Sequence, residues 1–174
     1  ISKCIVINKY EDSYFQKRAV FYTYLKNYQA AVADYDEAIL INQTKTEYYI
    51  SRALCHVTLK NYAAAYDDYG FTTMLNPNDA DSKKELQKLD PLLKAEYEKL
   101  GMISQNAYQF FLQRADKLAL LSEGFKLGPA IMNYYKCIQI EPKNPVPYNK
   151  AGILFRQLNM NKYAEQFLRY AAYA

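Results

Sequence analysis

The tetrapeptide Leu25-Lys26-Asn27-Tyr28 recurs 34 residues further on as Leu59-Lys60-Asn61-Tyr62. The match extends in both directions, because segments 12–45 and 46–79 share twelve identical residues in register. The matched pairs include Arg18-Ala19 with Arg52-Ala53, Asp34-Tyr35 with Asp68-Tyr69, and Asn42 with Asn76. A period of 34 residues is the length of one helix–turn–helix unit in an α-helical repeat array.

The apolar spacing inside one unit predicts two helices. Phe15, Ala19, Tyr22 and Leu25 are spaced by four, three and three residues, which places them on one face of a first helix. A second helix follows, with a facing stripe of Ala31, Tyr35 and Ala38. Alanine lets two helices approach closely, and large aromatic side chains fill the remaining space. The sequence therefore predicts an antiparallel helix pair with Asn27 in the turn.

These residues resemble the tetratricopeptide repeat family. The aromatic Phe15, the small Ala19, the aromatic Tyr35 and the closing Pro77 of the second unit match the family signature. The sequence departs from it at Arg18 and Arg52, where the family favours Leu, at Thr72 for Ala, and at Gln43 for Pro. The resemblance implies an all-α fold, a right-handed superhelical solenoid of antiparallel helix pairs.

The repeat register divides the chain into segments. We expect the end of a preceding repeat helix (1–11), two repeat units (12–45 and 46–79), an atypical charged helical segment (80–110), a unit with a turn insertion (111–144) and a final repeat-like unit (145–174). Segment 80–110 fits a capping extension as well as an atypical third repeat. Because 3–8 resembles the end of a second helix at 136–141, we infer that the chain is a fragment of a longer array.

Two local features refine this division. Asp79 is a candidate N-cap for a helix over 80–89, which we expect to restart or kink at Asp90-Pro91. Aligning segment 111–144 with the first two units requires about three extra residues in the turn around Glu123–Gly128.

The candidate catalytic groups all have a packing interpretation. His56 is the only histidine and falls on a position that packs between helices, while its neighbour Cys55 points about 100° away from it on the same helix. Cys4, Cys55 and Cys137 are too scattered for a disulfide framework or a zinc site. We predict no enzymatic activity, no cofactor and no metal. The acidic residues of the second helices are expected to form a solvated face: Asp34, Asp36, Glu37, Asp67 and Asp68.

Charge and hydropathy exclude further classes. Residues 1–100 carry 13 basic and 14 acidic side chains and residues 101–174 carry 9 and 4, far short of a nucleic-acid footprint. No apolar run approaches the roughly 20 residues of a membrane-spanning helix. The unpaired cysteines favour an intracellular compartment, either the cytoplasm or the ciliary and cytoskeletal apparatus.

The family resemblance also implies a binding surface, because the first helix of each repeat lines a concave groove. Carried over residue by residue, the predicted partner-binding groove is Gln16, Lys17, Val20, Tyr24, Ile50, Ser51, Leu54, Val57 and Thr58. This wall is mainly apolar and suits an extended or helical segment with apolar anchors. The co-chaperone subgroup that clamps carboxylates is not supported, since its cationic and amide positions hold Gln16, Val20, Ser51, Asp81 and Glu85.

Three functions remain open at this level. The first is a non-enzymatic scaffold that binds a protein or peptide in the groove. The second is a structural subunit of a large assembly, such as a ciliary, transport or secretion complex, that makes contacts through its convex face and ends. The third is a regulatory repeat domain of a larger enzyme. In each case the partner is a protein, and the chain is part of a larger complex or a longer chain.

Overall fold

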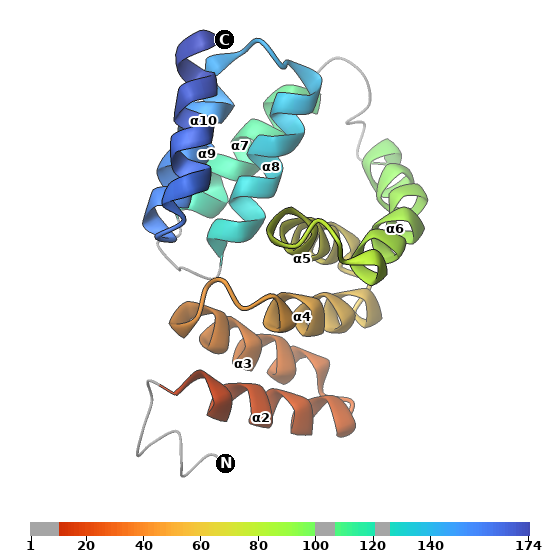
Figure 1. The fold of residues 1–174 in the computed structure, drawn as a ribbon. Helices are drawn as coiled ribbons and strands as arrows, with labels where there is room; N and C mark the ends of the chain where they lie inside the picture. Colours follow the sequence, from red (N-terminus) through yellow and green to blue (C-terminus); the bar gives the residue numbers. More distant parts are fainter. Residues whose placement is uncertain (1–10, 100–106, 121–125) are drawn as a thin grey trace. The chain divides into compact units, whose positions relative to one another are not determined.

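A computed structural model of the chain describes residues 11–99, 107–120 and 126–174, and these residues form helices and no strand (Figure 1). The helices are α2 (Asp12–Tyr24), α3 (Tyr28–Ile41), α4 (Thr46–Thr58), α5 (Tyr62–Leu75), α6 (Ala80–Lys99), α7 (Ala107–Leu120), α8 (Leu127–Ile140), α9 (Pro145–Gln157) and α10 (Asn161–Tyr173). The all-α prediction is confirmed for the described residues. The expected helix end at 1–11 lies almost wholly outside them.

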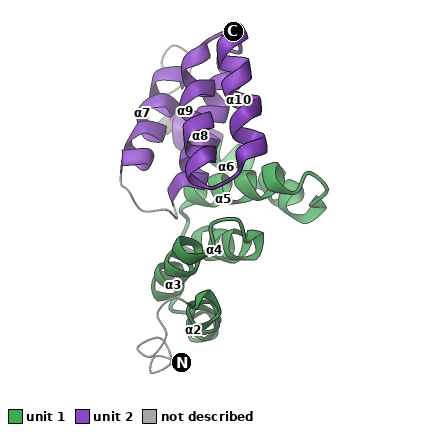
Figure 2. Cartoon of the chain, turned by 60° about the vertical axis from the view of Figure 1, so that its left-hand side comes forward, with its two compact units in different colours: residues 1–93 green, residues 94–174 purple. Residues whose placement is uncertain are grey.

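The chain forms two compact units, Ile1–Leu93 (unit 1) and Lys94–Ala174 (unit 2), and the boundary falls inside α6 (Figure 2). In unit 1, α2 packs on α3, α3 on α4 and α4 on α5. In unit 2, α7 packs on α8, α8 on α9 and α9 on α10. From α2 to α5 and from α7 to α10, each helix therefore packs on the next in chain order, which confirms the predicted stacking of antiparallel helix pairs within each unit.

Three turns between paired helices, α2–α3, α4–α5 and α9–α10, share one geometry. Lys26, Lys60 and Asn159 have φ values of 57°, 61° and 57°, in the left-handed region. Past the left-handed residue, the backbone N–H of Asn27 donates to the carbonyl of Tyr22 at 2.9 Å, which closes the helix end. Asn27 lies in the turn as predicted, but the strained residue is Lys26. Asn27 instead caps α3, its side chain accepting from the Ala30 N–H at 3.3 Å.

The predicted seam of alanines and aromatics forms the core. The small residues Ala19, Ala31, Ala53 and Ala65 are fully buried. Tyrosines fill the space beside them: Tyr35, Tyr69 and Tyr134 are each 2% exposed. The stripe ends earlier than predicted, because Leu25 follows the last turn of α2 and is exposed.

The predicted solvated acidic face is wrong for most of its members. Asp34, Asp67 and Asp68 are buried, and Asp36 is half-buried. Arginines at the positions where the family favours Leu explain the burial of Asp34, Asp36 and Asp68. Arg18 Nε donates to Asp34 Oδ2 at 2.7 Å, and Arg52 Nε donates to Asp68 Oδ2 at 2.9 Å, so each repeat neutralises its own aspartate. Glu37 is exposed, as expected.

Arg52 also joins two neighbouring repeats. Its Nη1 donates to Asp36 Oδ1 on α3 at 2.6 Å, while its Nη2 donates to Asp68 Oδ1 on α5 at 2.6 Å. Burial alone would lower the pKa of Arg52, but the two carboxylates outweigh it and raise the pKa above its usual value. The guanidinium is therefore a permanent positive charge that holds α3, α4 and α5 in one register.

Helix α6 differs from the expected break. It continues through Pro91 without interruption, so a restart at Asp90-Pro91 is wrong. Leu89 and Leu93 are buried on either side of the proline, and this packing offsets the lost backbone hydrogen bond. Asp79 caps the helix as predicted, its carboxylate accepting from the Ser82 N–H at 3.1 Å.

The unit predicted at 111–144 begins differently. Helix α7 starts at Ala107, four residues before the predicted boundary, and Gly128 lies in the first turn of α8 rather than in a turn insertion. Residues 121–125, where the rest of the expected insertion falls, lie outside the described residues.

Candidate functional site

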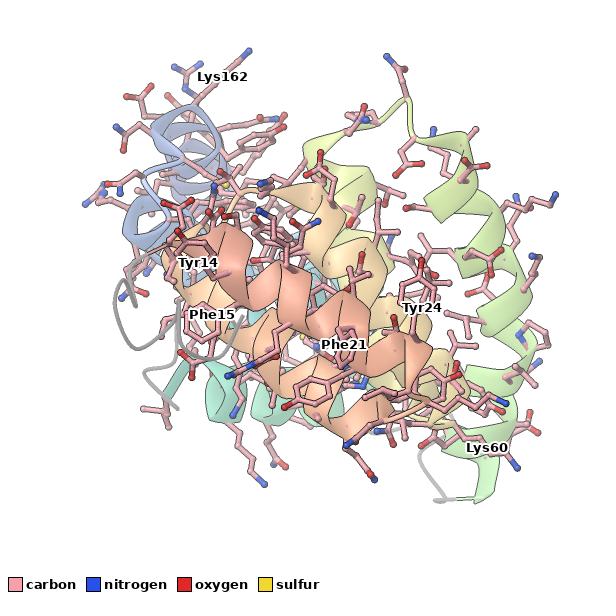
Figure 3. All side chains as sticks on the ribbon, turned by 90° about the horizontal axis from the view of Figure 1, so that it is seen from below. Tyr14, Phe15, Phe21, Tyr24, Lys60 and Lys162 are labelled. Carbon is pink, nitrogen blue, oxygen red and sulfur yellow. The ribbon has the colours of Figure 1, made fainter. Side chains whose placement is uncertain are left out.

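Part of the predicted groove is an exposed apolar surface on the first helices of unit 1. Val20 and Tyr24 of α2 are 36% and 81% exposed, and Leu54 of α4 is 54% exposed. Figure 3 views α2 from below and labels Tyr24. The N-terminal ends of α2 and α4 are held together, because the Tyr48 hydroxyl donates to Asp12 Oδ2 at 2.8 Å. Lys17 and Thr58 are exposed as well, and Gln16 is half-buried.

The other predicted groove residues are less available. Ile50 and Val57 are partly buried and pack against the core cluster that α4 and α5 form with Leu89 of α6. A hydrogen bond joins the hydroxyls of Ser51 and Tyr35. Among the predicted groove residues, the exposed large apolar side chains are therefore Val20, Tyr24 and Leu54.

Unit 2 contains a hollow at the corresponding place on its own first helices. A pocket of about 380 Å³ is lined by residues of α7, α8 and α9: Asp116, Ala119, Leu120, Tyr134, Lys150, Ile153, Leu154 and Gln157. Most of these residues occupy the groove-facing positions of the repeat. Sequence reasoning missed them because the groove positions were carried over to the first two units alone. The spacing of Phe111, Arg114 and Ala115 sets the register that would have found them.

The floor of this pocket is a hydrogen-bonded group from three helices. Lys150 Nζ on α9 donates to both oxygens of Asp116 on α7, at 2.7 Å each. The Tyr134 hydroxyl on α8 donates to Asp116 Oδ1 at 2.5 Å. Burial raises the pKa of Tyr134, and the Asp116 carboxylate raises it further, so the phenol stays protonated and remains a donor. We call Asp116, Tyr134 and Lys150 the polar floor.

At the repeat positions of the polar floor, unit 1 has partly different residues. Asp116, Tyr134 and Lys150 correspond in register to Val20, Tyr35 and Ser51. The tyrosine is common to both, but unit 1 has an exposed valine and a serine where unit 2 has an ion pair. The two units therefore carry side chains of different chemistry at the predicted groove positions.

The environments of Cys55, Cys137 and His56 favour a packing role over a catalytic one. Burial raises the pKa of the Cys55 thiol to about 11 and of Cys137 to about 12, which disfavours a thiolate nucleophile. Burial lowers the pKa of His56, and its Nδ1 is buried without a hydrogen-bond partner. Within the described ranges, no group of histidine, cysteine, aspartate and glutamate side chains has the clustering of a metal site. None of the described helices is both long and apolar enough to cross a membrane.

Comparisons with known proteins return solved structures alone. No family model and no curated protein matches the sequence. A crystal structure of MamA matches with a TM-score of 0.48 and 16% identity, covering 98% of this chain and 82% of that one. YrrB, described as a TPR protein with an unusual peptide-binding site, matches with a TM-score of 0.47 and 19% identity, covering 98% of this chain and 89% of that one.

The repeat assignment rests on the chain's own features. The two helix pairs of unit 1 repeat with a period of 34 residues, and three of the described turns share a left-handed residue. A buried alanine–tyrosine seam is present in both units, and the paired helices pack in chain order. These features are those of the tetratricopeptide-type helix pair that the sequence resembles.

Proposed function

We propose that this chain is a non-enzymatic scaffold that binds a segment of a partner protein along the first helices of its repeats. The observation that carries the proposal is the exposure of Val20, Tyr24 and Leu54. They are apolar or aromatic residues at the predicted groove-facing positions of two neighbouring repeats. Their side chains are not buried in the core of the unit. Exposed apolar side chains that recur at equivalent positions mark a binding surface better than scattered ones do.

The pocket of unit 2 supports the same proposal. Leu120 and Ile153, on its rim, are exposed apolar side chains on groove-facing positions, as in unit 1. Concave apolar surfaces with a few fixed polar groups are typical of peptide recognition by helical scaffolds. The buried thiols and the partnerless His56 nitrogen favour packing over chemistry, which agrees with a binding protein.

The experiment compares binding by the whole chain with and without its apolar anchors. Peptides selected against the wild-type chain from a displayed random library are titrated into Val20→Lys and Leu54→Lys by calorimetry. Truncating or charging an anchor costs about 2 kcal/mol or more, which weakens binding about thirtyfold. Leu40→Lys, on the exposed face of α3, is the matched control and is expected to bind like the wild type. Equal affinity for all four proteins, with circular dichroism unchanged, would reject groove binding.

A second function, a structural subunit of a larger assembly, is favoured by one observation. Tyr170 and Tyr173, both exposed on α10, lie with Tyr148 along a second hollow at the end of unit 2. Aromatic side chains are enriched at protein interfaces. Sedimentation over a range of concentrations separates the two functions. Association that Tyr170→Lys abolishes supports an assembly role, and a monomer at all concentrations argues against self-assembly through this surface.

A further inference from the structure

The pocket of unit 2 is electrically neutral. Among the described residues that line it, the charged ones are Asp116 and Lys150, and both carboxylate oxygens of Asp116 accept from the same ammonium group. The Tyr134 hydroxyl donates to the same carboxylate. Each charge in the pocket therefore already has its counter-charge before any partner arrives.

A charged partner side chain gains little in such a pocket. A carboxylate would have to draw Lys150 from Asp116 and would meet the Asp116 charge at close range. An ammonium or guanidinium group would compete with Lys150 for Asp116 and be repelled by Lys150. Either group would also lose hydration against the apolar rim of Leu120 and Ile153. An apolar side chain, or an uncharged amide, has neither cost.

We propose that the Asp116–Lys150 pair is a specificity determinant, which makes the pocket of unit 2 select an uncharged partner segment with an apolar anchor. This inference rests on the proposed function and adds the chemistry of the ligand to it. The apolar anchor contacts Ala119, Leu120 and Ile153, and polar groups of the segment's backbone face the polar floor. Removing one member of the pair would leave the other as an uncompensated charge, and the pocket would then prefer a partner side chain of the opposite charge.

The size of the effect follows from the exposure of the pair. The side chains of Asp116 and Lys150 are 36% and 37% exposed, so solvent screens them substantially. Interactions between such partly exposed charges change binding about fivefold rather than by orders of magnitude. The Tyr134 hydrogen bond holds Asp116 in place when Lys150 is replaced, because it comes from a different helix.

The experiment uses the whole chain with two substitutions. Lys150→Met keeps the unbranched apolar part of the side chain and leaves a negative pocket. Asp116→Asn keeps an acceptor for Tyr134 and leaves a positive pocket. An uncharged peptide selected from a displayed library against the wild-type chain is resynthesised with one central residue as Gln, Glu or Lys. Calorimetry of the wild type and the two pocket variants with these three peptides then gives nine affinities. Lys162→Met and Glu165→Gln, exposed on α10, make the same charge changes outside the pocket.

We expect the wild type to bind the Gln peptide best, Lys150→Met to prefer the Lys peptide over the Glu peptide about fivefold, and Asp116→Asn to show the opposite order. The α10 variants are expected to follow the wild type. A wild-type protein that prefers one charge, or two pocket variants with the same order, would overturn the inference while leaving groove binding intact. A library with no enriched peptide would overturn both.

Discussion

Replacing Arg52 with leucine, the residue that the repeat family favours at this position, is expected to destabilise unit 1 strongly. Arg52 is 3% exposed, and its guanidinium donates hydrogen bonds at 2.9 and 2.6 Å to Asp68 and at 2.6 Å to Asp36. Leucine fills much of the volume but leaves the Asp68 carboxylate, 1% exposed, without its counter-charge. Breaking a buried pair in this way costs about 3–5 kcal/mol.

A double replacement separates charge from packing. In Arg52→Leu/Asp68→Leu the unpaired carboxylate is gone, and a buried ion pair exchanged for apolar side chains is often neutral or stabilising. We therefore expect the double variant to recover most of the loss, with Asp36, half-buried on α3, returning to solvent. Lys88→Ala breaks an exposed pair with Glu85 within α6 and is expected to cost about 0.5 kcal/mol or less.

The assay is native-state hydrogen exchange read by mass spectrometry, because it reports the free energy of opening for α4 and α5 separately from unit 2. A loss of 3–5 kcal/mol is a large share of the roughly 5–15 kcal/mol that stabilises a typical domain, so peptides from these helices should lose most of their protection. A loss below about 1 kcal/mol in Arg52→Leu, or a double variant no more stable than the single one, would refute the reasoning.

Three further outcomes are expected. Gly152→Ala should cost about 1–3 kcal/mol in a thermal melt, because the new Cβ would lie 2.8 Å from Leu168 Cγ, and adding Leu168→Ala should restore much of it. Burial lowers the pKa of His56 below 6.5, so as the pH falls the unfolded chain takes up the imidazole proton more readily than the folded chain does. The free energy of unfolding should therefore fall as the pH drops below about 6.5. His56→Phe should make that free energy less dependent on pH in denaturation measured over this range. Cys55 and Cys137 should resist alkylation in the native chain and react after unfolding, as site-resolved mass spectrometry would show.

The sequence was a reliable guide wherever the controlling interaction is local or recurs with the repeat. The turn after Leu25, the cap by Asp79 and the buried tyrosines each depend on residues a few positions apart or on the same slot in each unit. The helix pairs follow from these because an alanine–aromatic seam can be buried only by a second helix.

The sequence interpretation failed where a partner lies on another helix. The aspartates of α3 and α5 look like a solvated face when each helix is considered alone, but Arg18 and Arg52 bind Asp34, Asp36 and Asp68 from neighbouring helices. The repeated arginines were visible in the sequence as departures from the family pattern, and the aspartates Asp34 and Asp68 recur with the repeat. Their sixteen-residue separation, equal in both units, was the signal that would have paired them.

By itself, the sequence determined the repeat period of unit 1 and the helix pairs, because these depend on periodic burial, and it predicted the positions that would line a groove. Only the tertiary structure decided which of those positions are exposed and which charges are paired. Ile50 and Val57 are partly buried, whereas Val20, Tyr24 and Leu54 are exposed. Asp116 forms an ion pair with Lys150 of another helix. The physical reason is that exposure and charge compensation depend on which side chains meet across neighbouring helices. Helical periodicity assigns a residue to a face and leaves its partner undetermined.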